Sequence, residues 1–166
     1  MGSLAELLAT GERQTLEFFF LRLKEVSEPT VVHEELLYTA SVLAHYARVS
    51  THSAVDLATP ATLGEVFEHF VLDTSLRNDG AIMEAAGAQC LLLAGFFQDQ
   101  MCRRHDIRWY AGLGAGFFSR AATLERSAQK AGLLTAIAAG FEPWRQRLAR
   151  LRRELCDRPY LVKTDH

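Results

Sequence analysis

The sequence of 166 residues contains little cysteine, and its cysteines form no recognisable motif. Cys90, Cys102 and Cys156 are odd in number and show no CxxC spacing. We therefore expect neither a disulfide framework nor a structural zinc site. This usage is typical of a reducing compartment, and we predict a cytoplasmic protein.

Long apolar runs are also missing. The most apolar stretch, residues 85–97, contains Gln89 and is about 13 residues long, whereas a membrane-spanning helix needs roughly 20. Residues 1–6 have neither the basic start nor the apolar core of a secretion signal. We expect no membrane span and no export, and we interpret residues 85–97 as part of a buried helix.

Patterns typical of β-strands are scarce. Only residues 16–23 alternate enough to suggest a strand, and helical spacing fits them almost as well. The clearest helical spacing follows a capping box formed by Thr62 and Glu65. The sequence therefore predicts an all-α fold, with residues 1–166 forming a single-domain bundle of about six helices.

Turn and loop signals divide this predicted bundle. The first clear helix follows Pro29-Thr30 and ends near Arg48, and residues 49–61 form a polar loop. A helix over about 81–104 is apolar on nearly every side and is therefore expected at the centre of the bundle. Further helices are expected after Asp106, over 133–141 and from Pro143, followed by a flexible C-terminal tail at 160–166.

The tripeptide Ala-Gly-Phe occurs three times, at residues 94–96, 115–117 and 139–141. A glycine inside a helix costs about 1 kcal/mol relative to alanine, so we expect close helix packing to offset it. Gly112 and Gly116, four residues apart, are assigned the same packing role. The alternative is a small apolar ligand held between helices. The cluster for either role is Gly95, Phe96, Phe97, Tyr110, Gly114, Phe117 and Phe118.

Charge is distributed unevenly along the chain. Residues 1–80 hold 12 acids and 5 bases, a net −7, and residues 81–166 hold 8 acids and 13 bases, a net +5. This asymmetry favours a homodimer. The last helix carries a basic face made of Arg145, Arg147, Arg150, Arg152 and Arg153. We expect these arginines to pair with the acidic N-terminal half rather than with nucleic acid, because the chain is slightly acidic overall.

Motifs for catalysis or cofactor binding are missing. Residues 112–116 are glycine-rich, but no strand precedes them and no Lys-Ser or Lys-Thr follows, as a phosphate-binding loop requires. Glu65, Glu68, His69 and Asp73 lack the Glu-x-x-His of di-iron bundles and are interpreted as a solvated face. Cys102 lies beside basic residues but has no nameable base, so we interpret it as a surface thiol. We therefore expect no enzyme activity, cofactor or metal.

One part of the sequence resembles a known family. Ala94-Gly95-Phe96-Phe97, the pair Arg103-Arg104, Asp106-Ile107, Trp109-Tyr110 and Gly114 are similar to the pattern of an uncharacterised family of small bacterial all-helical proteins. The likeness covers residues 86–121, and residues 35–47 look similar to an upstream helix of that family. Trp109 stands where the first of two tyrosines is expected. The resemblance implies an all-helical fold and a bacterial origin, and it implies no activity.

These observations together favour a non-enzymatic role. We expect a regulatory, adaptor or accessory subunit that works through contact with a protein partner whose identity the sequence does not indicate. The alternative from a different class is a binding protein for a small apolar ligand or cofactor held between helices. A filled interior would favour the first interpretation, and an enclosed apolar cavity the second.

Overall fold

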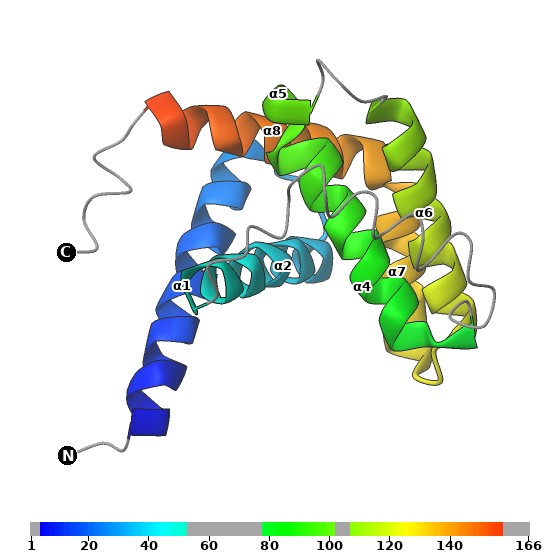
Figure 1. Cartoon of the computed structure of the whole chain (residues 1–166), viewed down its shortest axis with the longest axis horizontal. Helices are drawn as coiled ribbons and strands as arrows, with labels where there is room; N and C mark the ends of the chain where they lie inside the picture. Colours follow the sequence, from blue (N-terminus) through cyan, green and yellow to red (C-terminus); the bar gives the residue numbers. More distant parts are fainter. Residues whose placement is uncertain (1–3, 53–77, 102–106, 158–166) are drawn as a thin grey trace. The chain divides into compact units, whose positions relative to one another are not determined.

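A computed structural model describes residues 4–52, 78–101 and 107–157 of this chain. It divides the chain into two compact units, residues 1–57 and residues 58–166 (Figure 1). Each unit is described by itself below.

The first unit is a pair of helices. Helix α1 (Leu4–Val26) and helix α2 (His33–His52) pack against each other and are joined by a short turn that contains Pro29. Residues 16–23, which the sequence left open between strand and helix, lie within α1. Thr39 is buried in α2, and its hydroxyl donates a hydrogen bond of 2.9 Å to the Glu35 carbonyl oxygen. This local bond satisfies a polar group that burial would otherwise make costly.

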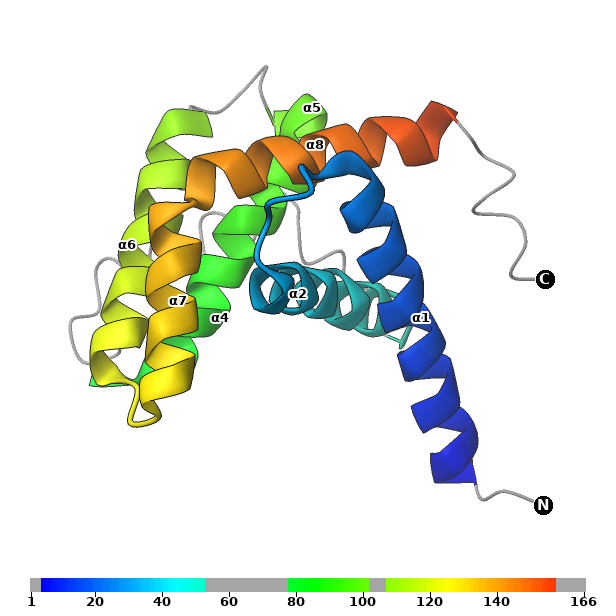
Figure 2. The same ribbon diagram turned by 180° about the vertical axis from the view of Figure 1, so that it is seen from behind.

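The second unit contains the remaining described helices. These are α4 (Gly80–Leu91), the π-helix η3 (Leu92–Phe96), α5 (Gln98–Met101), α6 (Ile107–Leu124), α7 (Ala128–Ala139) and α8 (Phe141–Asp157). Helix α6 packs against α4 on one side and α7 on the other, and α8 crosses this layer with its main contact to η3 (Figure 2). Side chains of α4, η3, α6, α7 and α8 are buried in the core, including Met83, Leu93, Phe118, Ile137 and Trp144.

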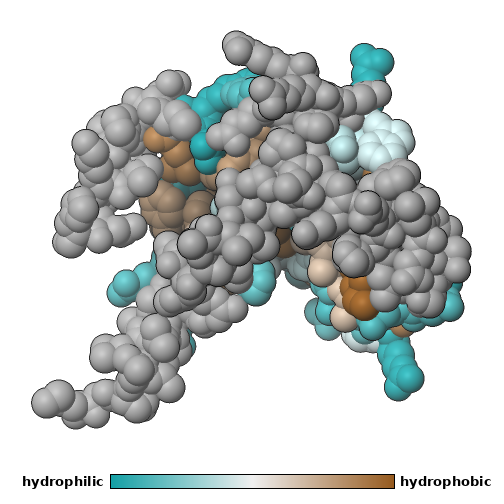
Figure 3. Space-filling view, viewed as in Figure 1, coloured by the Kyte–Doolittle hydropathy of each residue, from teal (hydrophilic) through white to brown (hydrophobic). Residues whose placement is uncertain are grey.

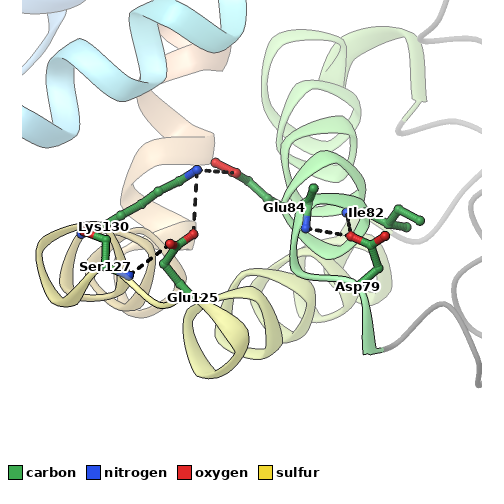
Figure 4. Close-up of polar contacts among 7 residues, drawn as sticks. Asp79, Ile82, Glu84, Glu125, Ser127 and Lys130 are labelled. Atoms are coloured by element: carbon green, nitrogen blue, oxygen red, sulfur yellow. Dashed lines mark hydrogen bonds and ion pairs between the residues drawn. The ribbon is translucent and has the colours of Figure 1, made fainter.

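Capping residues and ion pairs define the ends of α4 and α7 (Figure 4). Asp79 caps α4, because its Oδ1 accepts hydrogen bonds from the backbone N–H groups of Ala81 and Ile82 at 3.0 and 3.2 Å. Lys130 on α7 lies 3.2 Å from a carboxylate oxygen of Glu84 on α4 and 3.8 Å from one of Glu125. These exposed or half-exposed ion pairs add little stability, but they join three segments at one end of the layer.

The central helix expected over about 81–104 is interrupted by a π-helical turn. The Phe97 N–H donates to the Leu92 carbonyl oxygen at 2.9 Å, five residues back instead of four. Residues 90–97 are all buried, as their apolar composition predicted. The extra residue in the turn was not predicted, because apolar residues on every side produce no helical phase from which to recognise it.

The described residues confirm the all-α fold and the buried central helix. They form six helices when residues 80–101 are counted as one, and no strand occurs among them. The polar loop expected over 49–61 begins later than predicted, because α2 continues to His52. The rest of that loop, the capping box at Thr62, Cys102 and the tail at 160–166 lie outside the described residues. The assignment of all 166 residues to one domain stays a prediction.

Candidate functional site

Three glycines permit close packing in the second unit, and two of them, Gly95 and Gly114, belong to the predicted cluster. A Cβ atom at Gly87 would lie 2.9 Å from the Phe118 ring, and one at Gly114 would lie 2.5 Å from the Phe141 ring. A Cβ atom at Gly95 would lie 2.9 Å from the Arg145 carbonyl oxygen. Two of these glycines therefore receive a phenylalanine ring, and the third receives the backbone of a crossing helix.

The predicted glycine and phenylalanine cluster is divided between the core and the surface. Phe96 and Phe97 are buried in edge contact with each other, with ring centroids 5.2 Å apart, and Phe118 is fully buried. Tyr110 is half-buried, and Phe117 is mostly buried but lines a surface groove. Packing therefore accounts for three of these residues, because the Arg145 backbone lies against Gly95, the Phe141 ring against Gly114, and the Phe118 ring against Gly87.

Arg145 of α8 forms hydrogen bonds with the π-helical segment and with the first residue of α5. Arg145 Nη1 donates hydrogen bonds to the Ala94 carbonyl oxygen at 3.2 Å and to Gln98 Oε1 at 2.8 Å. The same guanidinium binds the Glu142 carboxylate, and this hydrogen bond lowers the pKa of Glu142 below its usual value. Arg145 therefore satisfies a carbonyl group close to the point where the regular helical hydrogen bonding changes.

Other members of the predicted basic face lie over aromatic rings or meet a carboxylate. The Arg152 guanidinium lies 5.0 Å from the Phe96 ring centroid and 5.3 Å from that of Phe97. Arg147 lies 4.6 Å from the Trp144 ring centroid, and exposed Arg153 pairs with Asp99 at 3.2 Å. Arg150 is exposed. These contacts join α8 to the segment at 94–99 and to its own first turn, and the expected pairing with the acidic N-terminal half stays a prediction.

A surface groove runs along the exposed face of α6 and borders α4 at the buried side chain of Met83. Its volume is about 640 Å³, and the described residues that line it are Met83, Trp109, Gly112, Leu113, Gly116, Phe117 and Arg120. Apart from Met83, these residues belong to α6 and recur at intervals of three and four residues. The groove therefore follows one face of α6 for about three turns, or about 16 Å at 1.5 Å per residue.

Two glycines form the floor of this groove. A Cβ atom at Gly112 or at Gly116 would meet no atom of the described residues within 4 Å, unlike one at Gly87, Gly95 or Gly114. Trp109, which is 42% exposed, stands at one end of the row and Arg120 at the other. The sequence had assigned these glycines to packing within the chain, and the structure places them on the surface instead.

The space-filling view shows part of the surface near this region. Apolar surface is visible at the lower right of Figure 3, where Figure 1 places the first turns of α4. Arg120 at the edge of the groove donates a hydrogen bond of 3.0 Å to Asn78 Oδ1. It is the ionisable residue among the described lining residues, so the groove presents apolar contact area with one cationic end.

The ionisable groups of the core do not form a reactive centre. Burial raises the pKa of the Cys90 thiol to about 12, and burial next to Cys90 raises the pKa of Tyr110. A thiol with such a pKa is protonated at neutral pH and is a poor nucleophile. Within residues 4–52, 78–101 and 107–157, no three His, Cys, Asp or Glu side chains are grouped as a metal site would require.

Neither a membrane-spanning helix among the described residues nor a known relative points to a function for the site. No described helix combines the length and the apolar character needed to cross a membrane. Protein-family models, curated proteins and solved structures give no match to this chain. The resemblance to a bacterial family at residues 86–121 therefore stays a prediction.

Proposed function

We propose that this protein acts by binding another protein, as a regulatory, adaptor or accessory subunit, and that the α6 groove is its contact surface. The observation that carries this proposal is the pair of open glycines, Gly112 and Gly116, between exposed Trp109 and Arg120. Tryptophan and arginine are the side chains most often found as energetic anchors of protein interfaces. A cytoplasmic, bacterial setting belongs to this proposal and is supported by the cysteine usage and the family resemblance.

The shape of the groove favours a helix as its occupant. It follows α6 for about three turns, and helix-in-groove recognition uses anchors at intervals of three and four residues. Gly112 and Gly116 lack side chains, so the backbone of a second helix can approach closely, as α8 does at Gly95.

The alternative function is binding of a small apolar ligand. The groove volume of about 640 Å³ lies within the range of ligand pockets, which favours this alternative. Against it, ligand pockets usually enclose most of the ligand, and the interior cluster expected for this role is filled at Gly95 and Gly114. Native mass spectrometry of the purified chain should show no retained small molecule, and a stoichiometric one would support the alternative.

The proposal is tested by recovering the tagged full chain from the cells that naturally make it. The Gly116→Glu variant places a carboxylate on the groove floor, and Gly132→Glu places one on α7 at a position equally free of neighbours. Both should fold, because neither Cβ atom meets a described atom within 4 Å and both glycines are exposed. We expect a stoichiometric protein that is retained by the natural chain and by Gly132→Glu and lost from Gly116→Glu. Equal retention by both variants would overturn the proposal.

A further inference from the structure

We propose that the groove receives the α6 helix of a second copy of this chain, antiparallel to the first. The two-fold axis would pass at the level of residues 114 and 115. This inference rests on the proposed function, because it names the partner that the same groove binds. Its basis is the order of large, small and charged residues along the groove face, which is complementary to the same order in the opposite direction.

Antiparallel pairing of the groove faces of two copies brings large residues opposite glycines. The axis places Leu113 opposite the second copy's Gly116. A two-fold axis repeats this contact, so Leu113 of each copy fills the open position at Gly116 of the other. Phe117, which is 7% exposed, stays in the core of its own copy and borders the second copy's Gly112 without filling it. The same packing of a large side chain against a glycine occurs within the chain, where Phe118 covers Gly87 and Phe141 covers Gly114.

The same axis places Arg120 opposite the second copy's Trp109. A guanidinium over an aromatic ring is attractive, most of all over tryptophan. The second unit contains this contact at Arg147 over Trp144 and at Arg152 over Phe96, with distances to the ring centroids of 4.6 and 5.0 Å.

Shape selects the antiparallel direction. A parallel pair in register would bring Leu113 next to its own copy and Gly116 next to Gly116, so no large side chain would fill the open positions.

The oligomeric state of the purified full chain tests this inference. Light scattering coupled to size exclusion should give twice the chain mass of 18.5 kDa. The Gly116→Leu variant fills the position that Leu113 would enter, and we expect it to raise the dimer Kd by about tenfold or more. The matched Gly132→Leu variant, also on an open helical position, should remain a dimer. A natural chain that is monomeric at about 100 µM, or a Gly116→Leu variant that stays as dimeric as Gly132→Leu, would overturn the inference.

Cysteine cross-linking tests the direction of the pair in a background where Cys102 and Cys156 are replaced by serine. Trp109→Cys combined with Arg120→Cys should form an intermolecular disulfide, because the axis brings the two positions together. Trp109→Cys alone should not, because its two copies would lie about 16 Å apart along the helices, and a disulfide joins Cα atoms less than about 7 Å apart. A cross-link from the single variant, or none from the double variant, would overturn the antiparallel pairing.

The two proposals can fail separately. If the chain is monomeric but retains a different protein that Gly116→Glu loses, the self-pairing is wrong and the proposed function stands. If Gly116→Glu changes neither the retained proteins nor the mass in solution, both are wrong.

Discussion

Glycines in this chain have opposite roles that depend on what lies next to each missing side chain. Gly114 is buried beneath the Phe141 ring and beside Cys90, whereas Gly132 lies on the exposed side of α7 with no atom within 4 Å of a Cβ position. The same substitution should therefore have opposite effects on stability at these two positions.

We expect Gly114→Ala to lower the free energy of unfolding by about 1–3 kcal/mol, because the added methyl group overlaps the Phe141 ring and the core must shift. Gly132→Ala should raise it by up to about 1 kcal/mol, since alanine is the better helix former and nothing must move. Urea denaturation measures both values. A stabilised Gly114→Ala variant would show that this contact is not tight.

Cys90 makes stability depend on pH in the alkaline range. Its pKa is raised from 9.0 to about 12 in the folded chain, so folding favours the protonated thiol. The resulting stabilisation is fully present below pH 9, where the unfolded thiol is also protonated, and is lost as the pH rises toward 12. The free energy of unfolding should therefore fall with pH more steeply than in Cys90→Ala, by up to about 1.4 kcal/mol per pH unit.

The matched comparison for Cys90 isolates one thiol, because every other ionisable group is the same in both proteins. Denaturation in urea at several pH values between 9 and 11 gives the two slopes. Identical slopes would mean that the Cys90 thiol ionises in the folded chain as it does in the unfolded one.

At the scale of elements, the π-helical turn and α8 stabilise each other. Arg145 is mostly buried and donates to Ala94 and Gln98, whereas Arg153 forms an exposed ion pair with Asp99. Buried charge-assisted hydrogen bonds contribute more to stability than exposed ion pairs do.

We expect Arg145→Ala to lower the free energy of unfolding by about 1–3 kcal/mol, because the Ala94 carbonyl group loses its partner in the interior. Amide hydrogen exchange should become faster over residues 92–98 in this variant. Arg153→Ala, the control from the same helix, should cost less than about 1 kcal/mol and leave that exchange unchanged. Equal losses from the two variants would contradict the role given to Arg145.

The start of α4 depends on a single side chain. Asp79 accepts from two backbone N–H groups, so Asp79→Ala should lower the free energy of unfolding by about 1 kcal/mol. Asp79→Asn should retain most of the stability, because its side-chain oxygen can accept the same bonds. Thermal denaturation of the three proteins checks this order, and an Asn variant as unstable as the Ala variant would contradict capping by the side-chain oxygen.

At the scale of the whole molecule, self-association links stability to protein concentration. If two α6 helices pair, the melting temperature should rise as the concentration of the natural chain increases, because association stabilises only the folded state. The Gly116→Leu variant should show a much smaller rise, and Gly132→Leu should behave like the natural chain. Calorimetry at several concentrations measures this dependence, and a constant melting temperature in all three proteins would contradict it.

Local signals in the sequence were enough to predict most of the described helices and the burial of residues 90–97. Apolar residues at intervals of three and four, the turn at residues 78–80 and Pro143 each act within a few residues of themselves, so no neighbouring helix is needed to recognise them. The same signals did not predict the π-helical turn, whose extra residue depends on the fit between η3 and α8.

Only the tertiary structure decided whether each glycine is exposed or packed. Gly112 and Gly114 are two residues apart in the same helix, and yet Gly112 is exposed while Gly114 lies beneath Phe141. A residue advances 100° around a helix, so neighbours in sequence face different surroundings that only the positions of the other helices define. For the same reason, the sequence determined that α6 would be a glycine-rich helix, and the packing of α4, α7 and α8 determined which of its faces remained outside.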